Sequence, residues 1–449
     1  MQAIPQVLGG SEARGGVDAL WFVVAAVLAF QLMGTLGAPA NICWPGTALL
    51  ASQPLLAALL GGMQAELPAT AVTLALVVLV ARGRGMSSAR LACLFGILAG
   101  LMLGLKTGFI AIVVPLAAWL LWNMHGRCSA RGIAAVLALI CFIGGSSYAY
   151  AYVVTGNPFA PLLNGVFHSA YFPPGNFSDS RWSAPLDWTL PWQLTFHTQR
   201  YAECWDGMAG FALLGLLGAI PVALATPRLR WPAICAMVAS AAALTTVHYF
   251  RYAFPALSVL LLVCTAAVCI SDSLRIGTWL LGSLIVMNLA YQGTSVWTLH
   301  GGAIAPQTAF RSRAPVLQAF APERLLIAEA KRSDPSANVV LCSRDSPFAA
   351  ELAGRGFVVS WYDPELLGAS VSADEDGSGA GWQAIFQRTE AHFAIVSDAT
   401  ISSALRAALA DAHLVRRIGW AQLWRLPTPK GNPVDLVKRR DSAAAEFRP

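Results

Sequence analysis

Runs of apolar residues, each long enough to cross a bilayer as one helix, recur through the first 300 positions, and arginines lie in the short gaps between them. A helix needs about 20 mostly apolar residues to span the hydrocarbon core, because it rises about 1.5 Å per residue. Only 12% of the chain is charged and 56% is hydrophobic, whereas an average soluble domain is about 25% charged. The sequence therefore predicts an α-helical polytopic membrane protein.

The apolar runs predict about eight full spans and one pair of shorter helices. The expected spans are Ala19–Gly37, Ile42–Leu60, Leu67–Ala81, Arg131–Val154, Gly210–Thr226, Trp231–Val247, Phe254–Ile270 and Ile276–Trp297. Residues 91–124 allow only about 17 residues for each crossing, which is the minimum for a span. We therefore expect a short helix pair there that turns at Lys106. Residues 1–18 read as a polar tail.

The arginines predict the orientation, because loops rich in Lys and Arg stay in the cytoplasm. The gap at 82–90 carries three of them, and further arginines follow at 131 and at 228–230. Counting crossings from these gaps puts the loop at 155–207 and everything beyond residue 300 on the exoplasmic face. The net charge of +6 is spread over 449 residues. Orientation in a membrane explains it better than nucleic acid does, and we expect no nucleic-acid partner.

Beyond residue 300 the pattern changes from membrane spans to a soluble α/β domain. Apolar strand-like segments at 338–343, 357–362 and 392–398 alternate with helical segments. This alternation is typical of a three-layer α/β domain, which we expect at 301–427, after a transmembrane domain at 19–300. Residues 371–381 read as a flexible acidic loop, and residues 428–449 as a disordered tail.

Two groups of residues suit a lipid phosphate. In HYFRY at 248–252, Arg251 lies between His248 and Tyr252 where two expected spans meet. A guanidinium can donate to two phosphate oxygens at once. An aromatic-belt anchor with an interfacial arginine also explains this motif. Lys106 is either a lysine that extends to the membrane surface or a second phosphate ligand, because a buried ammonium needs an anion.

Acidic and basic residues of the exoplasmic face could serve a sugar. The candidates in the loop are His168, Asp179, Arg181, Arg200 and Glu203. They could supply a base or ligands for sugar hydroxyls, although solvated charge is the commoner explanation for any one of them.

Glu66 stands alone at the start of a span, where it could also simply complement the helix dipole. No metal-ligand spacing is visible in the sequence. We expect no cofactor, with a divalent metal left open.

Four segments together resemble a known class of enzyme. They are QAELPATAVTLALVVLVAR, GILAGLMLGLKTGF, TGNPFAPLLN and RYAFP, followed by the small α/β domain. This succession resembles bacterial polytopic glycosyltransferases of the GT-C type that use polyprenyl-phosphate-linked sugars. The resemblance implies inverting transfer of a hexosyl or pentosyl group to an envelope glycan or lipid at the exoplasmic face of the inner membrane. It also implies that Lys106 and Arg251 hold the lipid phosphate and that the loop helps to enclose the donor.

In one respect the sequence departs from that class. The GT-C pattern has a first transmembrane helix followed by a long acidic exoplasmic loop, and nothing similar precedes Glu66. We therefore expect the N-terminal catalytic-loop region to be lacking, with Glu66 and Asp179 as the candidate catalytic acids. A noncatalytic or transport protein that binds lipid-linked glycans is the alternative.

Overall fold

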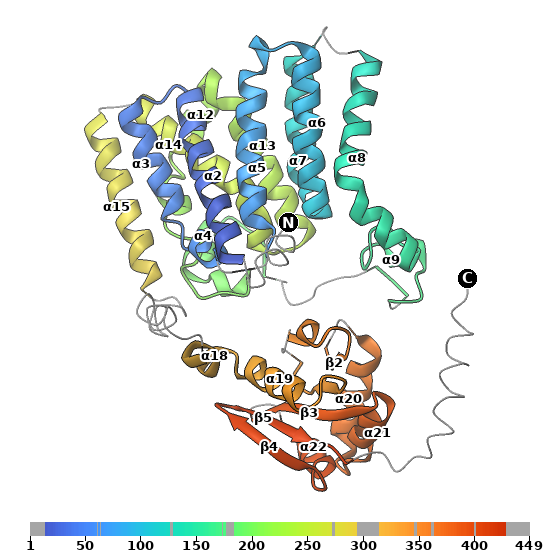
Figure 1. The fold of residues 1–449 in the computed structure, drawn as a ribbon. Coiled ribbons are helices and arrows are strands. Elements are labelled where there is room, and N and C mark those ends of the chain that lie inside the picture. Colours follow the sequence, from blue (N-terminus) through green and yellow to red (C-terminus); the bar gives the residue numbers. More distant parts are fainter. Residues whose placement is uncertain are drawn as a thin grey trace. The chain divides into compact units, whose positions relative to one another are not determined.

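The computed structural model describes residues 14–60, 62, 64–125, 129–172, 174–176, 184–271, 274–293, 314–344, 348–360, 363–398 and 401–427. The chain divides into two compact units, Met1–His300 and Gly301–Pro449. Each is described by itself. Figure 1 shows helices standing side by side in the first unit, and a sheet with flanking helices in the second.

The first unit is helical throughout. Its helices are α2 Arg14–Thr35, α3 Ala40–Ala51, α4 Pro54–Leu59, α5 Glu66–Arg82, α6 Ser88–Leu105, α7 Ile110–Asn123, α8 Ala130–Thr155, α9 Asn164–Phe167, α10 Leu190–Phe196, α11 Ala212–Gly215, α12 Ala219–Ala225, α13 Pro227–Thr246, α14 Phe250–Ser271 and α15 Leu274–Gln292. Within the described residues, six of them, α2, α5, α6, α8, α13 and α14, are long and apolar enough to cross a membrane. The predicted polytopic membrane fold is thereby confirmed.

Two of the expected spans are each broken into two shorter helices. The run at 42–60 forms α3 and α4, because Gln53 adopts an extended backbone before Pro54, as residues before proline commonly do. The run at 210–226 forms α11 and α12. In contrast, the expected short pair at 91–124 contains one helix of full length, α6, followed by the shorter α7. The expected turn lies at Lys106, which ends α6 in an extended conformation.

Helix contacts show which ends of the bundle lie together. Arg82, at the end of α5, donates from Nε to Thr35 Oγ1 at 2.9 Å. A Cβ on Gly37 would lie 2.6 Å from a guanidinium nitrogen of Arg228, so the start of α13 lies at the same end. The antiparallel order of α5 and α6 then brings Glu66 and Lys106 together at the opposite end, where α14 begins.

Helix α8 packs closely on α6 through glycines. A Cβ on Gly144 of α8 would lie 2.5 Å from the carbonyl oxygen of Gly100 and 3.2 Å from the nitrogen of Gly104. The two backbones therefore touch, as small residues permit in membrane helices. The rest of α8 is largely uncovered within the described chain: only 6% of its apolar window is buried.

The second unit is an α/β domain with a five-stranded sheet of order β2-β1-β3-β5-β4. Its elements are α18 Ala314–Phe320, α19 Pro322–Ser333, β1 Asn338–Leu341, η4 Phe348–Leu352, β2 Gly356–Val358, α20 Pro364–Asp376, α21 Ala380–Arg388, β3 Ala391–Ser397, α22 Ser403–Ala408, β4 His413–Ile418 and β5 Ala421–Arg425. Strands β2, β1 and β3 are parallel, and β5 and β4 follow in antiparallel pairing.

Both faces of this sheet are covered, in agreement with the expected three layers. Leu366, Trp382 and Leu405 from α20, α21 and α22 pack on one face. Leu326 of α19 and Leu352 of η4 pack on the other. The expected flexible loop at 371–381 is wrong in its first half, because residues 371–376 complete α20. The expected tail at 428–449 lies outside the described residues.

Candidate functional site

Three elements of the first unit bring charged side chains to one place. Glu66 is the first residue of α5, Lys106 ends α6, and Arg251 lies in the first turn of α14. Lys106 leaves its helix because its backbone is extended and a 3₁₀ turn, Thr107–Phe109, follows. Each charge therefore lies at a helix end.

Both cations face the same carboxylate oxygen. Lys106 Nζ lies 3.6 Å and Arg251 Nε 3.5 Å from Glu66 Oε1. The Glu66 side chain is 1% exposed, against 34% for Lys106 and 19% for Arg251. A buried carboxylate is tolerated when cations accompany it. Two cations thus face one carboxylate, and a second acid, Glu203, lines a cavity together with Arg251.

Each of the two cations also lies over an aromatic ring. Lys106 Nζ lies 3.3 Å from the centroid of the Tyr252 ring, and the Arg251 guanidinium carbon lies 5.0 Å from that of Tyr249. Cations over aromatic faces are attracted by the ring quadrupole. The two tyrosines of the HYFRY motif thus position the cations, one ring for each.

A cavity of about 340 Å³ adjoins this cluster. Arg251 lines it together with Gln64, Glu203, Trp205 and Tyr249, and the apolar part of its wall comes from α4 and from the loop at 202–208. Several polar atoms around it are buried and find no hydrogen-bond partner within the described chain. They are Gln64 Oε1, Glu66 Oε2, Trp205 Nε1 and Arg251 Nε. Buried polar groups in proteins are normally paired, so their position beside a cavity is typical of a binding site.

The loop before α11 forms the opposite wall, and one buried asparagine fixes it to the membrane helices. Asn288 of α15 is fully buried. Its Oδ1 accepts from the backbone N–H of Phe211 at 2.7 Å, and its Nδ2 donates to Ser52 Oγ at 3.1 Å. Gly210 fits here because its φ is +71° and a Cβ would lie 2.6 Å from Gln53 Oε1. The break between α3 and α4 is thereby joined to the loop.

The candidates from the sequence fall into two groups. Glu66, Lys106, Arg251 and Tyr252 are brought together in the ion cluster, and Glu203 lines the adjoining cavity.

The other candidates lie elsewhere or are not described. The ring nitrogen Nδ1 of His248 lies 2.9 Å from the carbonyl oxygen of Ala184, so His248 attaches the loop to α14. His168 and Arg200 are exposed and contact neither the cluster nor the cavity in the described chain. Asp179 and Arg181 lie outside the described residues.

Sequence reasoning missed Gln64, Cys204 and Trp205 as cavity residues. Gln64 stands two positions before Glu66, and the tryptophan follows Glu203 closely, so proximity to a candidate acid was the available signal. Burial raises the pKa of Cys204 to about 12, and burial also raises the pKa of Tyr249. Both groups therefore stay protonated at neutral pH and present a thiol and a hydroxyl rather than anions. Among the described residues, no three His, Cys, Asp or Glu side chains gather as metal ligands would.

The fold is that of a polytopic membrane protein with a C-terminal α/β domain, as expected. Among the solved structures that match is ArnT from Cupriavidus metallidurans in the apo state, with a TM-score of 0.55 and 15% sequence identity, over 96% of this chain and 86% of that one. No protein-family model and no curated protein matches by sequence.

Proposed function

We propose that this protein is a membrane glycosyltransferase that transfers a sugar from a polyprenyl-phosphate donor to an envelope glycan or lipid at the exoplasmic face of a bacterial inner membrane. The observation that carries the proposal is the convergence of Lys106 and Arg251 on one buried carboxylate beside a cavity. The fold likeness to ArnT supports the same class of function.

The cluster suits the phosphate of a lipid. Its two cations attract an anion, and the guanidinium of Arg251 offers donors to two oxygens at once. Lys106 adds a point charge that can follow the phosphate. Both cations lie at helix ends of a membrane bundle, where a lipid chain could remain in the bilayer while its phosphate reaches them.

The reaction that this arrangement favours is a single displacement. An acceptor hydroxyl attacks the anomeric carbon, the bond to the phosphate oxygen breaks, and the configuration inverts. Arg251 and Lys106 stabilise the charge that develops on the departing lipid phosphate. Glu203, which lines the cavity, is the described acid best placed to take the proton of the acceptor hydroxyl. Glu66 contacts both cations and in this scheme offsets part of their charge.

The distribution of arginines supports the exoplasmic placement. Arg82 and Arg228 lie at one end of the bundle, whereas the ion cluster lies at the other. Positive charge marks the cytoplasmic end, so the cluster and the cavity belong on the exoplasmic side. The C-terminal end of α15 lies there too, since Asn288 contacts Ser52 and Phe211 at that end.

A noncatalytic protein that binds lipid-linked glycans is the second candidate. One observation favours it: Glu66, the acid in the cluster, is already paired with both cations. In that case the cavity would hold the donor without transferring its sugar.

Donor binding and transfer separate these possibilities. Membranes that contain the protein are incubated with radiolabelled polyprenyl-phosphate sugar, and bound and transferred label are measured. We expect Arg251→Ala and Lys106→Ala each to reduce binding about tenfold or more, as the loss of a charged hydrogen bond does. Arg84→Ala, an exposed arginine at the other end of the bundle, should bind normally. Absence of binding in the wild type contradicts both functions, and binding without transfer leaves the noncatalytic one.

A further inference from the structure

The second unit has a topological switch point of the kind at which α/β proteins bind ligands. After β1 the chain passes to η4, whose Leu352 packs on one face of the sheet. After β3 it passes to α22, whose Leu405 packs on the other face. The two connections diverge at the carboxyl ends of adjacent parallel strands. In open α/β sheets such a switch point is where ligands bind.

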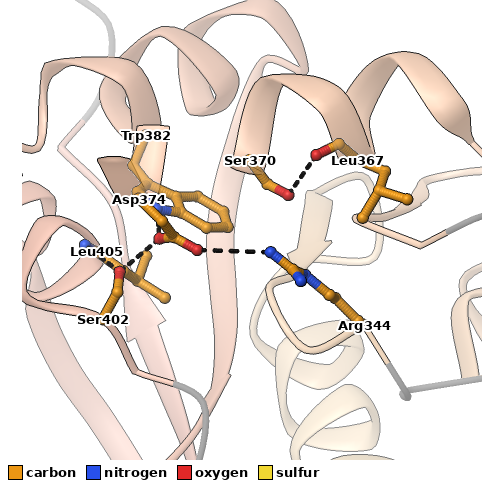
Figure 2. Close-up of polar contacts among 7 residues, drawn as sticks. All are labelled: Arg344, Leu367, Ser370, Asp374, Trp382, Ser402 and Leu405. Carbon is orange, nitrogen blue, oxygen red and sulfur yellow. Dashed lines mark hydrogen bonds and ion pairs between the residues drawn. The ribbon is translucent and has the colours of Figure 1, made fainter. Parts of the chain in front are cut away.

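A chain of polar contacts crosses this switch point. Arg344 follows β1, Ser402 caps α22 after β3, and Asp374 of α20 lies between them (Figure 2). One oxygen of Asp374, Oδ1, accepts from Trp382 Nε1 at 2.8 Å and from Ser402 Oγ at 2.5 Å. These two bonds fix the plane of the carboxylate. The other oxygen, Oδ2, lies 3.8 Å from Arg344 Nη2.

Asp374 Oδ2 and the guanidinium of Arg344 do not form a hydrogen bond with each other. A separation of 3.8 Å exceeds the reach of a hydrogen bond, and within the described residues neither group has another such partner. About a third of the Asp374 side chain and half of that of Arg344 are exposed, at 32% and 54%. The switch point therefore offers one fixed acceptor beside several donors, open to solvent.

Neighbouring hydroxyl groups of a sugar match this pair. One hydroxyl donates to Asp374 Oδ2, and the next accepts from Arg344. A phosphate fits less well, because the carboxylate next to the guanidinium repels it and nearly cancels the local charge. The membrane cluster differs in this respect, since there two cations face one carboxylate.

We propose that the edge of the sheet at Arg344 and Asp374 binds a carbohydrate through two neighbouring hydroxyl groups. This site is separate from the membrane cavity and does not depend on the proposed transferase function. It suits a glycan that the protein holds while the membrane unit binds a lipid-linked donor.

Saturation-transfer NMR on the full chain in lipid nanodiscs tests the proposal. The probes are methyl α-glucoside, methyl α-galactoside and methyl α-mannoside. We expect at least one to receive saturation from the wild type, and its signal to fall about tenfold or more in Asp374→Asn and Arg344→Gln. Asp374→Asn preserves the acceptor that binds Trp382 and Ser402 and changes only Oδ2. Arg388→Gln is the matched control, because Arg388 pairs with Glu365 on the same domain, and it should retain the signal.

Several results would overturn the proposal. They are no saturation of any glycoside, signals equal to that of the wild type in Asp374→Asn and Arg344→Gln, or loss of the signal in Arg251→Ala of the membrane cluster. Binding of inorganic phosphate that depends on Arg344, without glycoside binding, would identify an anion site instead. Hydrogen exchange of α20 to α22 serves as the check on folding. If Asp374→Asn loosens these helices, Arg344→Gln decides alone, since Arg344 makes no hydrogen bond within the described chain.

Discussion

At the scale of single residues, Glu66 sets the charge of the membrane cluster. Glu66→Gln keeps the shape of the side chain but leaves Lys106 and Arg251 without their shared anion. A carboxylate and a phosphate about 5 Å apart repel by a few kcal/mol at an effective dielectric of ~20. We expect Glu66→Gln to bind polyprenyl phosphate about tenfold more tightly, as measured by native mass spectrometry, and to unfold at a lower temperature.

The control for this experiment is Glu66→Asp, which preserves the charge and should show little gain in affinity. If Glu66→Gln instead binds the lipid more weakly, then Glu66 serves to position the cations and does not compete with the phosphate.

A second acid, Glu323 of α19, makes the stability of the α/β domain depend on pH. Glu323 is 5% exposed, and its Oε2 has no hydrogen-bond partner within the described chain. Burial raises its pKa above the ordinary value. The folded domain therefore holds this proton more strongly than the unfolded chain, and stability falls as pH rises from the ordinary pKa through the raised one.

Glu323→Gln should remove this cost. We expect the variant to be more stable than the wild type by about 1 to 3 kcal/mol at pH 8 and equal to it at pH 4. Hydrogen exchange of α19, corrected for intrinsic rates, measures the difference. An equal difference at both pH values would mean that the charge of Glu323 is not responsible.

The sequence predicted several residues of the site but not their contacts. Lys106 is a candidate because an ammonium in the bilayer needs an anion, and Arg251 because a guanidinium can donate to two phosphate oxygens. The anion they contact in the described structure, Glu66, stands 40 and 185 positions away in sequence. Only the packing of α5 against α6 and α14 brings the three together, and no local pattern encodes that. Trp205 and Gln64 belong to no sequence motif that would have indicated a role in the cavity.

At the scale of elements, Asn288 joins α15 to the two walls of the cavity. Asn288→Leu removes both hydrogen bonds while it fills the same space, and it leaves the buried N–H of Phe211 unpaired. We expect a loss of about 1 to 3 kcal/mol, faster hydrogen exchange at 199–211 and 52–59, and weaker donor binding. Ser52→Ala removes the bond to Asn288 Nδ2 and the local bond from Ser52 Oγ to the Leu49 carbonyl. It keeps the bond between Asn288 and Phe211 and should have a smaller effect. Unchanged exchange at 199–211 would contradict this role.

Element types were predicted well where the periodicity was long, as in α5, α8 and α14. The predictions were wrong where a tertiary contact outweighed the local preference of the sequence. Residues 371–376 are acidic and are followed by the glycine-rich segment 377–381, a composition that reads as a loop. The structure makes them helical because the Asp363 side chain caps α20 and Asp374 binds Trp382 and Ser402. The break at Gln53 follows instead from a local signal, Pro54, which the interpretation of 42–60 as one span did not take into account.

At the scale of the whole molecule, the arginines divide the first unit into two ends with different charge and chemistry. Arg82 and Arg228 lie at one end, and the ion cluster, the cavity and the last turns of α15 lie at the other. If the arginine end is cytoplasmic, the chain leaves α15 on the exoplasmic side, and the α/β domain follows it there. The donor phosphate and the proposed carbohydrate site would then share one compartment.

Alkaline phosphatase fusions in a bacterial host test this orientation, because the enzyme becomes active only outside the cytoplasm. We expect a fusion after Leu426 to be active and a fusion after Gly85, at the arginine end, to be inactive. Replacing the three arginines at 82–90 by glutamine should weaken this asymmetry, since lysine and arginine set the orientation. An active fusion after Gly85 together with an inactive fusion after Leu426 would show that the protein has the opposite orientation in the membrane. The Glu66 cluster would then face the cytoplasm, where the donor would have to be presented on the inner leaflet.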